Sequence, residues 1–227
     1  MNKAFFEWHG EVLKLLSVLY FFLLQKNILS PGIFYGKITE TFMIHDLIPT
    51  SMKLELNEQQ KMIRNMVREF AEKEIAPVAA ELDKTGEYPT KILDKMAKLG
   101  LLGIIIPQQY GGAGLDTISY VTVVEEISRK CASTGVITSV HNSLAAWPIM
   151  KYGTEEQKKK YLPILAKGEK IGAFAGTEPN AGSDLGAMKT QAVLKGHHYV
   201  INGDKTFITS GPKAGIIIVF AVTDKNA

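Results

Sequence analysis

Near Lys170 the spacing of apolar residues changes, and this change constrains the fold more than any other feature of the chain. Before it, apolar residues recur every three or four positions, as in amphipathic helices. After it, short runs rich in β-branched residues alternate with glycine-containing turns, as in strands. Helices followed by strands indicate an α+β protein with more than one domain rather than repeated βαβ units. We therefore predict an all-α domain over 52–170 and the start of a β domain over 171–227.

The segment before Lys170 predicts about five helices, most of which have a recognisable start or stop signal. Asn57 followed by Gln60 is close to a capping box, and Pro77 should kink or end the helix that begins there. Thr154 followed by Gln157 is another capping-box start. The remaining expected boundaries are Pro89 to a cap at Gly100, Asp116 to about Lys130, Ser133 or Thr134 to about Met150, and an end of the last helix near Gly168.

The segment after Lys170 predicts short strands separated by turns. The turns are expected at Lys195-Gly196-His197 and at Asn202-Gly203-Asp204, and Asn-Gly is a strong signal for a type I′ hairpin turn. A sheet that stops at Asp224, close to the end of the chain, has an unpaired edge, so we expect the β domain to be incomplete within these residues. The expected strands are Gly172–Thr177, Thr190–Leu194, Tyr199–Asn202, Thr206–Thr209 and Ile216–Val222.

Residues 1–51 differ in composition from the rest and hold nine of the 20 aromatic residues. Their most apolar run, Val12–Leu24, is too short for a membrane-spanning helix, which needs about 20 residues. The segment contains no arginine, and Glu7 and Glu11 are atypical of a signal or transit peptide. We interpret 1–51 as an extension upstream of a start at Met52, with a weak membrane-associating segment as the alternative. We expect no membrane span and a cytoplasmic protein, or a mitochondrial matrix protein if the source is eukaryotic.

The charge, the cysteine and histidine positions and the glycine loop argue against several classes of binding site. The net charge is only +3, and the basic cluster Lys158–Lys160 follows two glutamates on one helix, so we expect a solvated face and no nucleic-acid binding. Cys131 is the only cysteine, and no histidine pair has helical metal spacing, so we expect no disulfide and no metal. The loop Gly111–Gly114 lacks the G-x-G-x-x-G pattern, which favours a plain glycine turn over nucleotide binding.

The densest candidate site runs from Gly172 to Asp184, off a strand and into a loop of small residues. Small residues let backbone N–H groups approach a ligand closely. Further along, Phe207 and Thr209 would share one face of a strand, where a ring and a hydroxyl could contact a planar cofactor. A plain hairpin turn with a core aromatic explains the same pattern equally well, and the residues alone leave both interpretations open.

The segment Ala173–Asp184 resembles the T-E-P-x-A-G-S-D signature of the acyl-CoA dehydrogenases, and Phe207-Ile208-Thr209 resembles their second flavin contact, W/F-I-T. The similarity extends from about Leu54 to Lys225 and is closest to the short-chain, butyryl-CoA branch. The segments that carry it elsewhere are Glu58–Gln60, Val67–Phe70, Glu74–Pro77, Pro107–Gly114, Trp147–Ile149 and Gly153–Lys158. Residues 1–51 have no counterpart.

The resemblance implies an N-terminal helical domain, a β-barrel-like middle domain and a C-terminal helix bundle. It implies an FAD-dependent enzyme that oxidises a short-chain acyl-CoA to the trans-2-enoyl-CoA. The electrons would pass to an electron-transfer flavoprotein, and the full-length protein would be a homo-oligomer. Ser183 would also contact the CoA substrate. The implied cofactor-binding residues are Phe174, Ala175, Gly176, Thr177, Glu178, Gly182, Ser183, Phe207, Ile208 and Thr209.

The catalytic residue is the main departure from the resemblance. The family places its carboxylate base on the C-terminal bundle, which is absent from these 227 residues, and Glu178 is not that base. We therefore expect an inactive fragment of a dehydrogenase that retains flavin weakly or not at all. The alternatives are an acyl-CoA oxidase-like flavoenzyme, a non-catalytic helical interaction module, and a nucleotide-binding regulator built on Gly111–Gly114.

Overall fold

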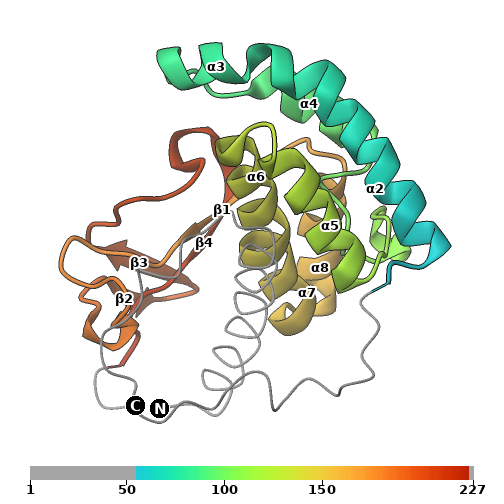
Figure 1. The fold of residues 1–227 in the computed structure, drawn as a ribbon. Coiled ribbons are helices and arrows are strands. Elements are labelled where there is room, and N and C mark those ends of the chain that lie inside the picture. The colour runs from blue at the N-terminus through green and yellow to red at the C-terminus, as the bar shows by residue number, and fades with distance from the viewer. Residues whose placement is uncertain (1–54, 225–227) are drawn as a thin grey trace, which may run out of the picture. The chain divides into compact units, whose positions relative to one another are not determined.

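A computed structural model of the chain describes residues 55–224, in which helices precede strands (Figure 1). Of these, residues 57–224 belong to one compact unit. The extension expected over 1–51 lies outside the described residues. The helical elements are α2 (Glu58–Phe70), α3 (Ala76–Thr85), α4 (Thr90–Lys98), α5 (Thr117–Ser128), α6 (Ala132–Ser139), α7 (Trp147–Tyr152) and α8 (Glu155–Ala166), with π-helical turns at Ala71–Ile75 and Val140–Ala146.

The helix starts follow the capping signals of the sequence. The side chain of Asn57 accepts a hydrogen bond from the Gln60 amide at 2.8 Å, and the Gln60 side chain accepts one from the Asn57 amide at 3.0 Å. Thr154 and Gln157 form the same reciprocal pair at the start of α8. Asp116 caps α5 through the Ser119 amide at 2.7 Å. These three predicted helix starts are confirmed. Each cap provides a hydrogen-bond partner for a backbone amide that has none within the first turn of the helix.

The prolines shape two of the predicted helices differently from expectation. The break expected at Pro77 falls earlier, at the π-helical turn Ala71–Ile75, and Pro77 lies in the first turn of α3. The single helix expected to run to about Met150 is divided by a second π-helical turn, Val140–Ala146, with Pro148 in the first turn of α7. Proline lacks the amide hydrogen and collides with the carbonyl four residues earlier, so a wider turn before it relieves both problems.

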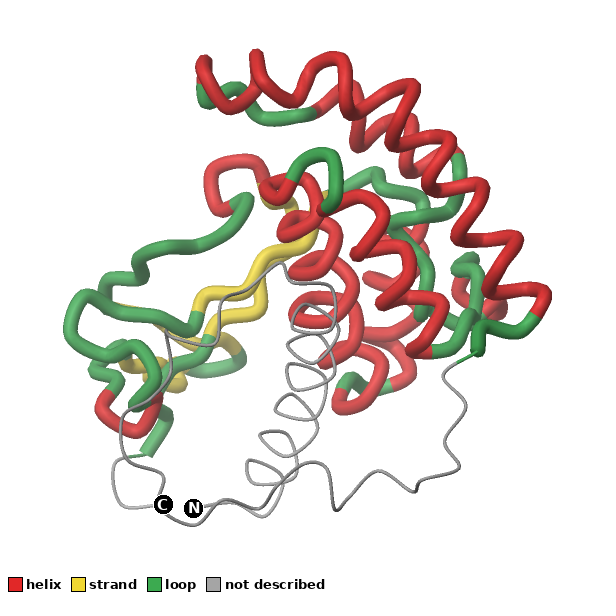
Figure 2. The backbone as a smooth tube through the Cα atoms, viewed as in Figure 1, coloured by secondary structure: helices red, strands yellow, loops and turns green. Residues whose placement is uncertain are grey.

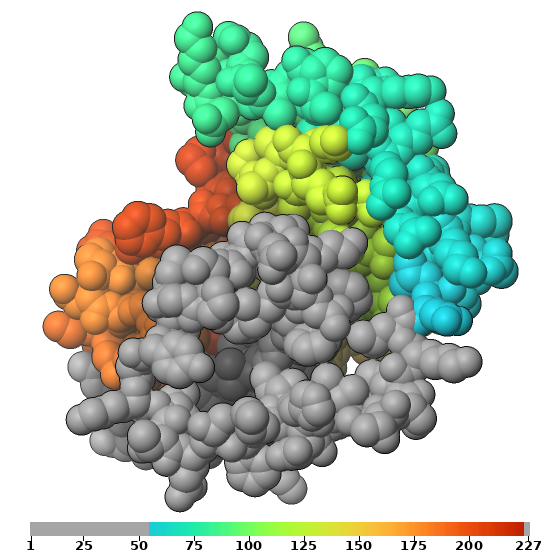
Figure 3. All heavy atoms as spheres, viewed as in Figure 1, coloured from blue at the N-terminus to red at the C-terminus, as the bar shows by residue number. Residues whose placement is uncertain are grey.

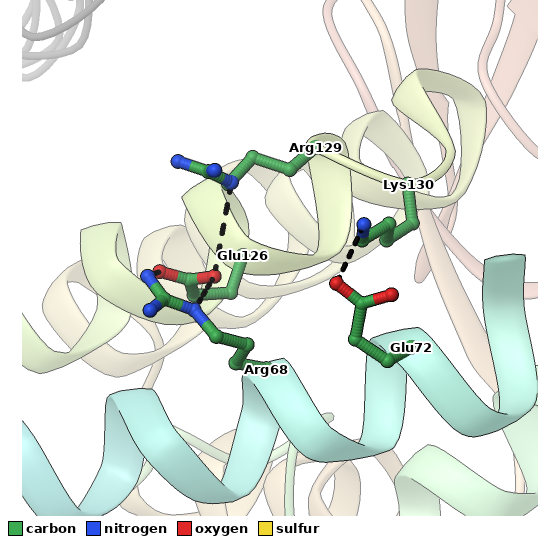
Figure 4. Close-up of polar contacts among 5 residues, drawn as sticks. All are labelled: Arg68, Glu72, Glu126, Arg129 and Lys130. Carbon is green, nitrogen blue, oxygen red and sulfur yellow. Dashed lines mark hydrogen bonds and ion pairs between the residues drawn. The ribbon is translucent and has the colours of Figure 1, made fainter.

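Helix α5 lies at the centre of the helical part and is buried along most of its length. Its buried residues include one charged side chain, that of Glu126, which is 3% exposed. Arg68 on α2 donates two hydrogen bonds to this carboxylate, from Nε to Oε2 at 3.0 Å and from a terminal nitrogen to Oε1 at 2.7 Å. Lys130 and Glu72 form a second ion pair at 2.6 Å beside it (Figure 4). The first contact fixes α2 against α5, and the second joins the segments that follow these two helices.

The strands form two separate pairs (Figure 2). β1 (Ile171–Ala175) pairs in parallel with β4 (Ala214–Val219), and β2 (Gln191–Lys195) pairs antiparallel with β3 (His198–Asn202). Ile216 and Ile218 of β4 pack against the buried cluster of Ile106, Tyr110, Ala146, Ile149, Leu162, Leu165 and Ala166. The β1–β4 pair therefore packs against the helices. This packing fixes the positions of the segment that leaves β1 and of the segment that enters β4.

Two expectations for the strands are wrong. The turn expected at Lys195-Gly196-His197 is confirmed and joins β2 to β3, with a φ of +62° at Gly196, but no hairpin forms at Asn202-Gly203. Gly203 instead approaches Thr190 so closely that a Cβ would lie 2.3 Å from its hydroxyl oxygen. Residues Thr206–Thr209 form no strand. Asn-Gly is a local signal, and the packing of Gly203 on Thr190 overrides it.

Candidate functional site

The two segments that carry the family resemblance lie side by side. The Thr206 amide donates a hydrogen bond to the Thr177 carbonyl at 3.0 Å. The ammonium group of Lys205 donates to the Gly176 carbonyl at 2.9 Å. Phe207–Thr209 therefore begins directly beside the end of β1, although the two segments lie far apart in the sequence.

Glu178 holds this junction together. Its side chain is buried, with 7% of its surface exposed, and it forms an ion pair with Lys205 Nζ at 2.9 Å. It also accepts hydrogen bonds from the backbone amides of Thr190 at 2.9 Å and Lys189 at 2.7 Å. The Thr190 side chain, which contributes most, together with the Lys189 amide and the Lys205 ammonium group, lowers the pKa of Glu178 to about 2. The carboxylate is thus a structural anion whose acceptor positions are used by the protein.

Beyond Glu178 the chain makes a tight turn. Glu178 and Ala181 exchange two backbone hydrogen bonds, at 2.8 and 3.1 Å. Ala181 is buried under this turn, whereas Gly182 and Ser183 project to the surface. A Cβ added to Gly182 would meet nothing within 4 Å. The turn therefore presents Ser183 to an approaching ligand with open space beside it.

Phe207 is the most unusual residue of the site. It is 91% exposed and has a φ of +55°, and Ser210, three residues later, has a φ of +62°. The left-handed conformation costs a residue with a side chain about 1 to 2 kcal/mol. Such strained residues cluster at ligand-binding sites, where the surrounding structure holds them in place. The prediction that Phe207 and Thr209 share one face of a strand is wrong, because this segment is a strained loop.

Three hydroxyl groups are free to bind a ligand. Those of Thr177, Ser183 and Thr209 form no hydrogen bond with any part of the chain in 55–224. Thr177 and Thr209 are half-buried and lie on the two neighbouring segments. Small residues, free hydroxyls and an exposed ring suit a flat cofactor with polar edges, so the residues present fit a flavin. The Phe174 ring, unlike the exposed Phe207 ring, packs edge-on against another aromatic ring, that of Phe220, with centroids 5.0 Å apart.

His141 is a buried residue near the site that the sequence did not reveal. It accepts a hydrogen bond from the Gly172 amide on Nδ1 at 3.0 Å, and its Nε2 lies 3.1 Å from the Leu165 carbonyl. Nε2 therefore carries the proton, and the ring joins α8 to the start of β1. Burial lowers the pKa of His141 to about 4, so the ring is neutral at physiological pH. The sequence gives no signal for the partners of His141, because Leu165 and Gly172 are distant along the chain.

The glycine loop at Gly111–Gly114 is occupied by its own backbone. The Ala113, Gly114 and Leu115 amides donate to carbonyls of 103–106 at 2.8 to 2.9 Å. A Cβ on Gly112 would lie 2.1 Å from the Ile106 carbonyl oxygen. Amides used in this way cannot hold a phosphate, so the glycine-turn interpretation stands over nucleotide binding.

Residues 55–224 contain neither a candidate metal site nor a candidate membrane-spanning helix. No cluster of three or more histidine, cysteine or acidic side chains in this range could bind a metal ion. None of the helices in the described part of the chain is long and apolar enough to cross a membrane.

Comparison with known proteins identifies the family of the chain. The family model for the acyl-CoA dehydrogenase N-terminal domain matches residues 57–169, and the model for the middle domain of the same family matches residues 173–227. Together they cover most of the chain and include both segments of the site. The chain belongs to the acyl-CoA dehydrogenase family.

Individual relatives support this assignment. A short-chain-specific acyl-CoA dehydrogenase of Clostridium acetobutylicum is 55% identical over 175 residues, which are 77% of this chain and 46% of that protein. The chain thus spans about half the length of this curated relative. A chain solved in work on the electron transferring flavoprotein of Acidaminococcus fermentans is 50% identical, with a TM-score of 0.75 and coverage of 77% of this chain and 46% of that one. An acyl-CoA dehydrogenase of Bacillus anthracis in complex with FAD is 39% identical, with a TM-score of 0.71 and coverage of 75% and 30%.

Proposed function

We propose that residues 57–225 form the part of a short-chain acyl-CoA dehydrogenase that binds FAD and the acyl-CoA. One observation carries the proposal: the Thr206–Thr177 hydrogen bond brings two segments with free hydroxyls together beside the strained, exposed Phe207. The proposed cofactor-binding residues are Phe174, Ala175, Gly176, Thr177, Glu178, Gly182, Ser183, Phe207, Ile208 and Thr209.

These residues would have different tasks. The Thr177 and Thr209 hydroxyls donate hydrogen bonds to polar atoms of the isoalloxazine ring, and the exposed Phe207 ring covers part of it. Exposed Ser183 contacts the CoA moiety. FAD, when bound, would accept the hydride that leaves a carbon atom of the acyl-CoA. The protein supplies the placement of the ring and the exclusion of water around it.

Glu178 contributes to the flavin site by holding the surrounding backbone in place through the contacts of its carboxylate. A group with a pKa of about 2 is a poor proton acceptor, and its oxygens already bind Lys189, Thr190 and Lys205. We propose that the α-proton of the acyl-CoA is taken by a carboxylate outside residues 57–225. Dehydrogenation then requires a further domain, and the 227-residue chain alone is inactive.

The larger organisation follows the family resemblance. We propose a helical domain over 52–170 and a β-barrel-like domain that begins at 171, to which the β2–β3 hairpin contributes. Val193, Leu194, Tyr199 and Ile201 of this hairpin are exposed, as expected of strands that further strands would cover. Electron transfer to an electron-transfer flavoprotein, a homo-oligomeric assembly and a cytoplasmic or matrix location belong to the same proposal.

FAD titration of the 227-residue chain tests the proposal, with quenching of flavin fluorescence as the readout. We expect weak but saturable binding that becomes roughly fivefold weaker in Thr177→Val and in Thr209→Val, because each loses one hydrogen bond. Thr223→Val, at an exposed threonine outside the site, is the matched control and should bind like the unmodified chain. Equal binding by all four proteins would contradict the assignment of the site.

A further inference from the structure

A helical hairpin of the N-terminal part reaches the second segment of the site. The Tyr88 hydroxyl, in the turn between α3 and α4, donates a hydrogen bond to the Ser210 hydroxyl at 2.8 Å. The two residues are 122 positions apart in the sequence. In the space-filling view, the atoms of the α3–α4 region meet the red atoms of the segment that leads into β4 (Figure 3). This contact is the only side-chain hydrogen bond to Ser210 among the described residues.

Ser210 has a conformation that needs such support. Its φ of +62° places a residue with a Cβ in the left-handed region, which glycine occupies at no steric cost. The Ser210 carbonyl accepts hydrogen bonds from the amides of Lys213 at 2.9 Å and of Ala214, the first residue of β4, at 2.8 Å. The Gly211 amide donates to the Ile208 carbonyl at 2.9 Å. The orientation of Ser210 therefore determines how Phe207–Thr209 is joined to β4.

Tyr88 is well placed to provide the support, because its own position is fixed. Its carbonyl accepts a hydrogen bond from the Thr90 amide at 2.7 Å, at the start of α4. Helix α4 is anchored by three buried side chains, Ile92, Leu93 and Met96. Tyr88 itself is half-buried, and burial raises the pKa of its hydroxyl, which therefore keeps its proton for the hydrogen bond.

We propose that Tyr88 is a positioning residue of the flavin site: through Ser210 it holds the loop that presents Phe207 and Thr209 to the cofactor. This role rests on the proposed function of the loop. It assigns the α3–α4 hairpin a direct part in ordering a site that otherwise belongs to the strand region.

Hydrogen exchange of the 227-residue chain, followed by mass spectrometry without flavin, tests the contact itself. Tyr88→Phe removes only the hydroxyl, and we expect the amides of 207–214 to exchange roughly fivefold faster, as for the loss of one hydrogen bond. The amides of α2 and α5 should be unchanged. Tyr199→Phe, at an exposed tyrosine of β3, is the matched control. Unchanged exchange in 207–214, or an equal increase throughout the chain, would overturn the proposal.

Two substitutions at the other end of the contact sharpen the test. Ser210→Ala removes the hydroxyl but keeps the Cβ, so it should accelerate exchange as Tyr88→Phe does, with no further increase in the double variant. Ser210→Gly removes the hydroxyl together with the steric cost of the left-handed conformation. We expect Ser210→Gly to exchange more slowly over 207–214 than Ser210→Ala. Additive effects of Tyr88→Phe and Ser210→Ala would mean that the two residues act independently and would overturn the proposal.

FAD titration then separates this inference from the proposed function. If Tyr88 positions Thr209, Tyr88→Phe should weaken FAD binding by about the same factor as Thr209→Val, roughly fivefold. Unchanged FAD affinity in Tyr88→Phe alone would overturn the positioning role and leave the flavin site intact. Unchanged affinity in both variants would refute the flavin site itself, and the positioning role, which rests on it, would fail with it.

Discussion

Lys205 Nζ lies 2.9 Å from the Glu178 carboxylate and 2.9 Å from the Gly176 carbonyl oxygen. The Lys205 ammonium group thus links the buried Glu178 carboxylate to the backbone of Gly176, two residues earlier. Lys205 is itself 12% exposed, so it is almost withdrawn from solvent. Because Thr206 follows directly and pairs with Thr177, this ion pair determines where the second segment begins.

Replacing Lys205 should therefore damage both the fold and the site. Lys205→Met keeps the apolar stem but leaves the Glu178 carboxylate buried without its cation, which is strongly destabilising. We expect the Tm to fall by roughly 5 to 10 °C, measured by differential scanning calorimetry. Lys213→Met is the control, because Lys213 is exposed and forms no ion pair with the described residues. Equal Tm values for the two variants would show that the buried pair is not required.

His141 should make the protein sensitive to mild acid. The unfolded chain takes up a proton on this residue near pH 6.5, whereas the folded protein takes it up only near the lowered pKa of about 4. The contribution of His141 to the free energy of unfolding is therefore fully present above pH 6.5. It declines as the pH falls toward 4, by about 3 kcal/mol in total. Urea unfolding at pH 7.5 and 5.0 measures it. The decline should be smaller in His141→Gln and unchanged in His197→Gln, which alters an exposed residue.

The Arg68–Glu126 pair should contribute more to stability than its neighbour (Figure 4). Glu126→Ala removes two charge-assisted hydrogen bonds from a nearly buried acceptor, and we expect a loss of about 2 kcal/mol in the free energy of unfolding. Lys130→Met breaks the more exposed pair with Glu72 and should change the stability by no more than about 0.5 kcal/mol. Denaturant titration distinguishes the two, and equal losses would contradict the role of burial.

The start of β1 should tolerate no side chain at Gly172. An added Cβ would lie 2.4 Å from Ala145 Cβ and 3.2 Å from Leu165 Cδ2, in the contact between the helices and the first strand. We expect Gly172→Ala to destabilise the protein by about 2 kcal/mol through overpacking. Gly182→Ala, where a Cβ would meet nothing, should leave the unfolding midpoint unchanged. A stable Gly172→Ala variant would show that the two parts can move apart at this contact.

The sequence predicted the features that depend on neighbouring residues. Capping boxes at Asn57 and Thr154 involve side chains three positions apart, so their spacing alone reveals them. The change from helices to strands near Lys170 was visible for the same reason. The hairpin expected at Asn202-Gly203 does not form, because the local signal is overridden by Thr190, a partner that is distant in sequence.

The candidate site was predictable only in part. The small-residue loop and the Phe207–Thr209 segment were identified from their composition and resemblance, and the structure brings them together at Thr177 and Thr206. The supporting residues were missed, because contacts such as Tyr88–Ser210 join positions with no shared motif. A buried lysine such as Lys205 has no signal of its own, since lysine is usually exposed.

Hydrogen exchange of the 227-residue chain in the presence of excess FAD tests the central claim most directly, because it locates even weak binding. We predict slower exchange in the segments 174–183 and 207–209 with FAD, and no change in either with NAD or ATP. No protection of these two segments by FAD, or protection of 111–114 by NAD or ATP instead, would contradict the assignment of the flavin site.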